Sequence, residues 1–233
     1  MTLLDFVVQM CESELNVQLL IESGFVPHFL QTSLEGGPLA SSLVSHSFLV
    51  SVSRVYSLHP TTFQLPPSYF AFLGANMESS AEADKECALS SLSFSLRHKA
   101  GSLPAILGLP DLLRCWLACG KTTSEQLRFA FYESLKGLLA VESTQERDTY
   151  SNDVFLLASN VGAPSNHPMP GNLAKCVEDL MYYVDIPFTA MELKTLEVVR
   201  ALLPWEWGYK TLFRETGKHL GLLLKQICFL FLI

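Results

Sequence analysis

Residues able to carry out chemistry are scattered along the chain without the spacing of a known site. Gly120-Lys121-Thr122 looks like the end of a phosphate-binding loop, but such a loop needs a glycine five positions before Gly120. Cys115 stands there, and the segment before the loop is predicted to be a helix where a strand is required. We therefore reject a nucleotide site, and we expect Thr122 and Glu125 to form a capping box that opens the next helix.

The histidines and cysteines do not predict a catalytic or metal site. No Gly-x-Ser-x-Gly or His-Glu-x-x-His motif is present, and no histidine has a carboxylate at a suggestive spacing. The six histidines are His28, His46, His59, His98, His167 and His219. The six cysteines include no Cys-x-x-Cys pair, so we expect buried, reduced thiols, with Cys115 and Cys119 sharing a helix face. We expect no catalytic residue, no cofactor and no metal, and hence a protein that is not an enzyme.

Composition narrows the class of partner and the compartment. The 233 residues carry a net charge of −7, which disfavours a nucleic-acid binder because such proteins need a basic footprint. The apolar run at 220–233 is shorter than the roughly 20 residues that span a bilayer, so we expect no membrane partner. No Asn-x-Ser/Thr acceptor is present, and the N-terminus lacks a basic flank before its apolar run. These features indicate a reducing compartment, the cytoplasm, with the nucleus as an alternative.

The elements follow a repeating pattern. In the stretch from Leu15 to Leu34, Gly24 suits the left-handed residue after a helix and Pro27 suits the first turn of the next. Pro67 follows Pro27 by 40 positions, and Pro110 follows Pro67 by 43. A period of roughly 40 to 47 residues built from helices is typical of armadillo and HEAT repeats. We predict an all-α armadillo/HEAT-type solenoid with corners at Gly24, near Leu65-Pro66, at Gly108 and at Gly217, where Gly24 and Gly217 adopt positive φ.

The same pattern predicts the boundaries of the helices, of an insertion and of the domain. Longer helices are expected at 39–58, 82–97, 123–142 and 189–203, and residues 143–172 are expected to be an insertion between repeats that ends in a proline-rich loop. We expect one domain over residues 1–233, truncated at one or both ends because both ends offer uncapped apolar helices. The aromatic cluster Trp205, Trp207 and Tyr209 can be an exposed anchor or a buried plug, and we favour the plug.

Four stretches carry a resemblance to a known family. Thr2–Leu34, Leu65–Ser79, Glu86–Leu107 and Glu192–Gly217 resemble the C-terminal half of the 26S proteasome non-ATPase regulatory subunit 5 family, which are HEAT/armadillo-like assembly chaperones. Members of that family are longer than this chain, and Gly221–Ile233 lacks their charged continuation. The resemblance implies a non-enzymatic chaperone that binds the C-terminal domain of one ATPase subunit while the base of the regulatory particle assembles.

Basic residues on the longer helices suggest where such a partner binds. The last helix of each repeat lines the concave wall of a solenoid, so we expect a basic groove that raises the encounter rate with an acidic partner. The groove residues we predict are Arg54, Arg97, Arg128, Lys136 and Arg200, and further basic positions on or beside these helices are His98, Lys99 and Lys194. The alternatives are a general armadillo scaffold or transport adaptor and, more remotely, an α-helical enzyme.

Overall fold

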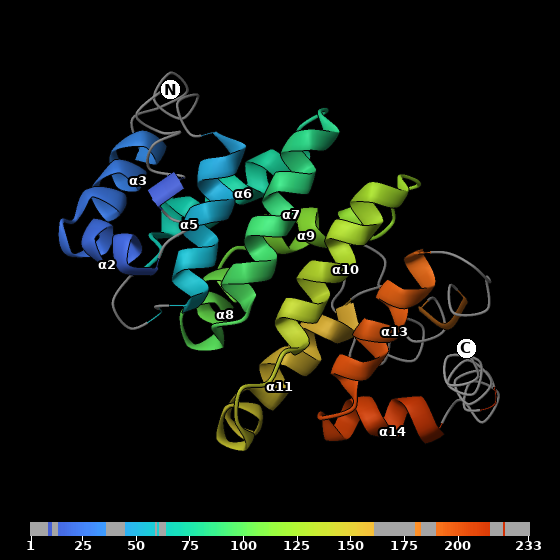
Figure 1. The fold of residues 1–233 in the computed structure, drawn as a ribbon. Coiled ribbons are helices and arrows are strands. Elements are labelled where there is room, and N and C mark those ends of the chain that lie inside the picture. The colour runs from blue at the N-terminus through green and yellow to red at the C-terminus, as the bar shows by residue number, and fades with distance from the viewer. Residues whose placement is uncertain are drawn as a thin grey trace. The chain divides into compact units, whose positions relative to one another are not determined.

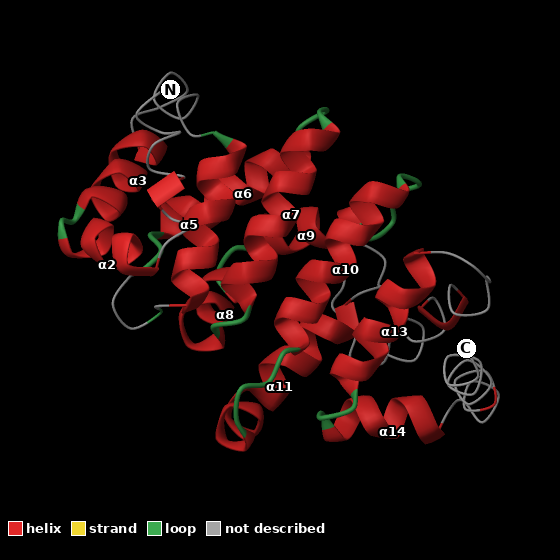
Figure 2. Cartoon of the chain, viewed as in Figure 1, coloured by secondary structure: helices red, strands yellow, loops and turns green. Residues whose placement is uncertain are grey.

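The structure is a computed structural model that describes residues 9–10, 14–35, 45–58, 60, 64–160, 180–182, 190–214 and 221. All regular secondary structure in these ranges is helical, which confirms the all-α class (Figure 2). The chain forms two compact units, residues 1–119 and 120–233 (Figure 1). The continuous solenoid stays a prediction.

The first unit contains three helices that begin with a proline in their first turn. Its helices are α2 (Glu14–Glu22), α3 (Phe25–Glu35), α5 (His46–Leu58), α6 (Pro67–Glu78), α7 (Glu82–Leu96), α8 (Lys99–Leu107) and α9 (Pro110–Cys119). Pro27 is the third residue of α3, while Pro67 and Pro110 open α6 and α9. The missing N–H of proline costs nothing in a first turn, so the predicted proline spacing correctly marks three helix starts.

Two pairs of helices in the first unit run parallel. In α6 and α9, Gly74 lies against Leu112, and further along both helices Glu78 pairs with Arg114 at 2.6 Å. In α5 and α7, His46 meets Asp84 near the two helix starts, and the rings of Tyr56 and His98 meet near the two ends. The polar pairs join residues separated by 36 to 38 positions. Parallel helices at this spacing are what stacked repeats require.

A buried hydroxyl network joins α5, α6 and α7. Tyr69 of α6 has no exposed surface, and its hydroxyl bonds to Ser53 of α5 and, at 3.4 Å, to Ser95 of α7. Ser53 and Ser95 also donate to the backbone carbonyls of Leu49 and Ser91 in their own helices. Because these buried polar groups satisfy one another, three helices can pack closely around serines.

The second unit contains α10 (Glu125–Leu139), α11 (Thr144–Asn160), α13 (Ala190–Leu202) and α14 (Glu206–Arg214). Helix α10 packs against α13 and α11. Trp205, which lies between α13 and α14, is fully buried and stacks on Trp207 at a ring-centroid distance of 5.6 Å. The ring of Trp207 in turn meets Phe155 of α11. These aromatic rings therefore hold the start of α14 against α11.

One prediction about the second unit, a capping box, was wrong, and one helix was not predicted. Residues 144–160, inside the expected insertion at 143–172, form a helix. Ser143 accepts a hydrogen bond from the backbone N–H of Glu146, whose carboxylate accepts one from the N–H of Glu142, so side chains satisfy the helix start. The expected Thr122–Glu125 capping box is absent, because α10 begins after Ser124 and the Thr122 hydroxyl accepts from the Ser124 N–H.

The predicted corners differ in their outcome: one is a left-handed glycine, two are turns without one, and one is not among the described residues. Gly24 has φ +68° and separates α2 from α3, as predicted. Pro66 immediately precedes α6, and Gly108 ends α8 with an ordinary φ of −78°, so a turn occurs there without a left-handed residue. Gly217, residues 1–8 and 36–44, and the proline-rich loop lie outside the described residues.

By length and apolarity, no single described helix could span a membrane. The bent pair of α8 and α9, which are 99° apart, meets those two criteria together.

Candidate functional site

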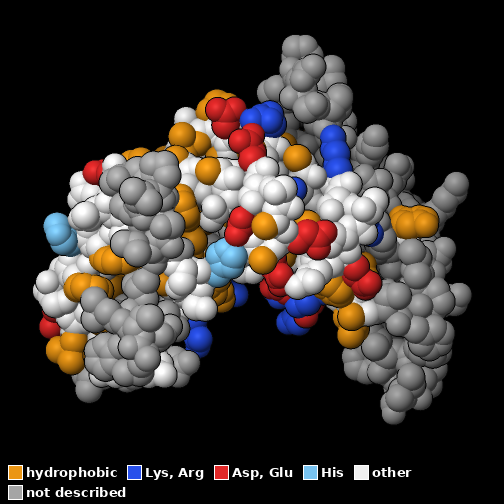
Figure 3. Space-filling view, turned by 90° about the horizontal axis from the view of Figure 1, so that it is seen from above, with side chains coloured by type: hydrophobic (Ala, Val, Ile, Leu, Met, Phe, Trp, Pro, Cys, Tyr) orange, Lys and Arg blue, Asp and Glu red, His pale blue; other side chains and the backbone are white. Residues whose placement is uncertain are grey.

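The five predicted groove residues are divided between the units. Arg54 and Arg97 belong to the first unit, whereas Arg128, Lys136 and Arg200 belong to the second. A groove that joins all five therefore stays a prediction. Where described side chains are visible in Figure 3, acidic and basic groups lie next to each other in several places. The local surroundings decide which of these cations are available to a partner.

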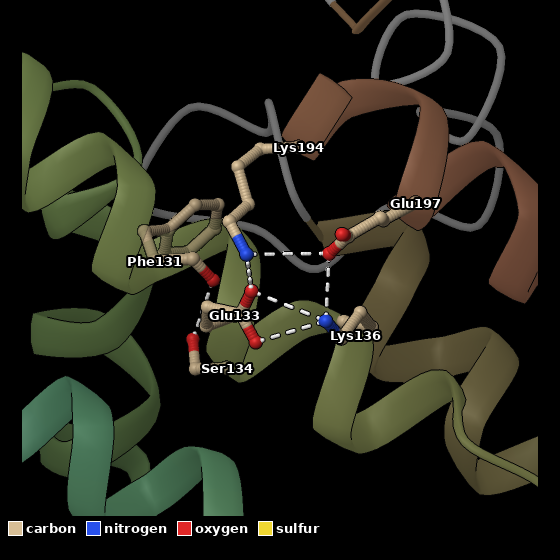
Figure 4. Close-up of polar contacts among 6 residues, drawn as sticks. All are labelled: Phe131, Glu133, Ser134, Lys136, Lys194 and Glu197. Carbon is tan, nitrogen blue, oxygen red and sulfur yellow. Dashed lines mark hydrogen bonds and ion pairs between the residues drawn. The ribbon is translucent and has the colours of Figure 1, made fainter. Parts of the chain in front are cut away.

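Lys136 is part of a charge-balanced cluster that fastens α10 to α13 (Figure 4). Its ammonium group lies 3.1 Å from the carboxylate of Glu133 and 2.7 Å from that of Glu197. Lys194 of α13 bonds to Glu133 and lies 3.3 Å from Glu197. Both pairs that cross between the helices join residues 61 positions apart, so α10 and α13 also run parallel. Two cations facing two carboxylates leave no net charge for a partner.

The pKa values of this cluster reflect its geometry. Partial burial acts to raise the pKa of Glu133, but hydrogen bonds from Lys194 and Lys136 outweigh it, so the pKa lies below its ordinary value. The hydrogen bond from Lys136 lowers the pKa of Glu197, and the bond to Glu133 raises that of Lys194. All three shifts favour the ionised forms. The cluster is therefore a structural contact between helices.

Two more predicted cations have different surroundings. Arg128 donates to the backbone carbonyl of Thr122 at 2.6 Å and thereby holds the turn before α10. Arg200, in the last turn of α13, is exposed and forms no ion pair with any described residue. Lys99, which we counted among the basic positions, is fully buried, so it contributes nothing to a surface.

Arg54 and Arg97 of the first unit are both exposed, and they lie at the same end of the α5–α7 pair. The contact between the rings of Tyr56 and His98, 5.6 Å apart, brings the C-terminal ends of these parallel helices together. Arg54 is two residues from Tyr56, and Arg97 is next to His98. Within the described ranges, neither arginine has a carboxylate partner. We call Arg54, Leu58, Phe94 and Arg97 the arginine end.

Helix α7 explains why Phe94 and Arg97 are accessible. Among residues 87–97 every side chain is buried except Ser90, Phe94 and Arg97, which recur at spacings of four and three and so lie on one face. The Arg97 guanidinium lies over the Phe94 ring, 5.0 Å from its centroid. Leu58, the last residue of α5, is 63% exposed. The arginine end therefore offers positive charge beside apolar surface.

The structure also shows a His–Asp pair that sequence reasoning missed. The Nε2 atom of His46 lies 2.8 Å from a carboxylate oxygen of Asp84, whose other oxygen accepts a hydrogen bond from Ser79 at 2.6 Å. The bond from Ser79 is the main cause of the lowered pKa of Asp84. Because both partners bond to the carboxylate and not to each other, this arrangement does not activate the serine. It joins the starts of α5 and α7.

The described cysteines confirm the expectation of buried thiols. Cys87, Cys115 and Cys119 are buried and not in disulfides. Burial raises the pKa of Cys87 and of Cys115 to about 11, and the hydrogen bond from Cys115 to Glu78 adds to the effect on Cys115. Such thiols are poor nucleophiles. Groups of three or more metal-ligating side chains are likewise absent from the described ranges.

The aromatic cluster divides between the two interpretations we weighed. Trp205 is the buried plug, since its indole N–H donates to the backbone carbonyl of Leu139 at 2.9 Å. Tyr209 fits the other interpretation, an exposed anchor, because it is 53% exposed. Its ring lies 4.6 Å, between centroids, from that of Phe213, which is 37% exposed.

Comparison with known proteins found no match: no protein-family model, no curated protein and no solved structure corresponds to the chain.

Proposed function

We propose that the chain is a non-enzymatic helical-repeat protein, an armadillo/HEAT-type solenoid, that binds another protein. We propose further that it is a chaperone for assembly of the base of the proteasome regulatory particle, and that it binds the C-terminal domain of an ATPase subunit. The four stretches named above, which resemble that chaperone family, are the reason for this partner. We also propose that the protein is located in the cytoplasm, with the nucleus as an alternative.

The observation that carries the binding role is the parallel stacking of α6 on α9 and of α5 on α7. Residues 36 to 38 positions apart meet in both pairs, and stacked helical repeats would give such contacts. Stacked repeats expose extended surfaces that are suited to a protein partner. The described polar clusters also support a structural or binding role. The cysteines are buried, and the His46–Asp84 pair and the α10–α13 charge cluster fasten helices to each other.

Affinity purification from cell extract followed by mass spectrometry tests the proposal. The tagged chain should enrich one proteasomal ATPase subunit over its homologues. A matched bait, in which Trp205→Ala disrupts the second unit, controls for capture by exposed apolar surface. Recovery of transport cargo without any proteasomal ATPase would favour the adaptor alternative, and recovery of neither would remove the chaperone role.

A further inference from the structure

We propose that the arginine end binds an acidic segment of the partner, with a carboxylate on the Arg97 guanidinium and an apolar side chain beside Leu58 and Phe94. This inference rests on the proposed function and specifies the contact surface and the chemistry of the segment that it takes. It is confined to the first unit, so it needs no relation between the units.

The first support is the absence of internal pairing. The chain has net charge −7, and several other described cations pair with carboxylates: Arg114 with Glu78, Lys136 with Glu197, and Lys210 with Glu206. Arg54 and Arg97 are exposed and form no such pair with the described residues. Two unpaired arginines at one end of a helix pair, in an acidic protein, are complementary to carboxylates that the described chain does not supply there.

The second support is the orientation of Arg97. Its guanidinium lies over the Phe94 ring, and a stacked guanidinium loses less freedom when its N–H groups bind a planar carboxylate. Such hydrogen bonds between ionised groups are shorter and stronger than neutral ones. Lysine cannot provide the same planar set of donors. The contact thus favours a carboxylate over a neutral acceptor.

The third support is the apolar surface beside the charges. Leu58 is 63% exposed and Phe94 is partly exposed, so an apolar side chain of the partner has surface to cover. Both arginines lie within a helical turn of the Tyr56–His98 contact. An extended segment of roughly six residues, at about 3.3 Å for each, is long enough to reach both. We therefore expect a short acidic segment that carries at least one apolar residue.

The acidic residues at the N-terminal end of α7 favour one orientation of the bound acidic segment. Glu82 and Asp84 lie in the first turn of α7, whereas Phe94 and Arg97 lie at its C-terminal end. A partner segment with its negative charge at the arginine end avoids these carboxylates. The competing explanation is that Arg97 only complements the negative end of the α7 dipole. In that case Arg97 contributes to stability and not to binding.

Titration of fluorescently labelled C-terminal domains of the regulatory-particle ATPases with the full chain separates these explanations. The variants are Arg97→Glu, Arg54→Glu and Arg97→Lys. The matched control is Lys85→Glu, because Lys85 also lies on α7, gives the same change in net charge, forms no ion pair with the described residues and lies far along the helix from Arg97, outside the predicted groove. Thermal unfolding of each variant checks its fold, and Arg97→Gln replaces Arg97→Glu if the latter does not fold.

We expect Arg97→Glu and Arg54→Glu each to raise Kd about tenfold or more, which is the size of effect seen when one partner of an interfacial charge pair is removed. Arg97→Lys should weaken binding by a smaller factor, and Lys85→Glu by less than about twofold. Equal Kd values for wild type and the arginine-end variants would overturn the inference and leave the proposed function standing. Equal weakening by Lys85→Glu would also overturn it, since net charge would then be the cause. If wild type binds no ATPase domain, the proposed function itself fails.

Discussion

The indole N–H of Trp205 donates a 2.9 Å hydrogen bond to the backbone carbonyl of Leu139, 66 positions earlier in the chain. Trp205 has no exposed surface, so this bond forms in the core of the second unit, where α10 ends. A buried carbonyl that loses its donor costs about 1–3 kcal/mol. Trp205 therefore provides both apolar volume and the partner for a helix end.

We predict that Trp205→Phe lowers the free energy of unfolding by about 1–3 kcal/mol, since it removes the donor and keeps an aromatic ring. Trp207→Phe is the matched control, because the indole N–H of Trp207 has no acceptor in the described structure. Urea unfolding of both variants measures the difference. Equal losses would show that the Trp205 bond is not the cause.

Gly24 supplies a second test, because its φ of +68° disfavours any residue with a Cβ. We predict that Gly24→Ala lowers the free energy of unfolding by about 1 kcal/mol or more, although nothing lies within 4 Å of the added atom. In contrast, Gly74→Ala adds a Cβ at an ordinary 3.5 Å from Leu112 inside α6 and should raise stability by about 0.5–1 kcal/mol. Thermal melts that move in the same direction for both variants would contradict the assignment.

Features of the fold that depend on residues close together in the sequence could be predicted from the sequence. Pro27, Pro67 and Pro110 mark helix starts and Gly24 marks a corner because each acts through its own backbone geometry. Helix α11 was missed although Ser143 and Glu146 have the spacing of a capping box, a signal that was available. Its first half is mostly polar and charged, so it lacks the apolar stripe that marks a packed helix in a sequence.

The contacts of the candidate site depend on packing and could not be predicted in the same way. His46 and Asp84 are 38 positions apart, and only the parallel packing of α5 on α7 brings them together. Lys136 could be recognised as basic, but its neutralisation by Glu197 requires α13 to lie beside α10. Arg97 lies over the ring of Phe94, three residues earlier at the end of α7, and this spacing allows the contact. That both side chains are accessible follows from the packing of α7, which buries its other faces.

The α10–α13 charge cluster predicts a pH dependence. The pKa values of Glu133 and Glu197 lie below the ordinary 4.5, so the stability they contribute is present above pH 4.5 and is lost as pH falls through the lowered values. The raised pKa of Lys194 means that its contribution is present below pH 10.5 and is lost as pH rises beyond it. Because these groups are partly exposed, we expect about 0.5–1 kcal/mol from the cluster.

Glu133→Gln should therefore flatten the loss of stability between pH 7 and pH 3, measured as the free energy of unfolding in urea. High salt should reduce the difference from wild type, because partly exposed charges are screened. An unchanged pH profile in the variant would show that the cluster does not contribute.

Burial of the thiols predicts slow alkylation. With a pKa of about 11, Cys87 and Cys115 carry little thiolate at pH 8, so iodoacetamide should modify them on the order of a hundredfold more slowly than an exposed thiol. Mass spectrometry of each cysteine peptide, with and without denaturant, measures this rate. Fast modification of either thiol in the folded chain would contradict its placement.

Hydrogen exchange of the full chain with and without a saturating ATPase C-terminal domain tests the central claim most directly, because it reports both binding and its location. We predict slower exchange in residues 54–58 and 94–102, which contain the arginine end and the start of α8, with little change in residues 190–214. Protection confined to the second unit, or no protection at saturation, would contradict binding at the arginine end.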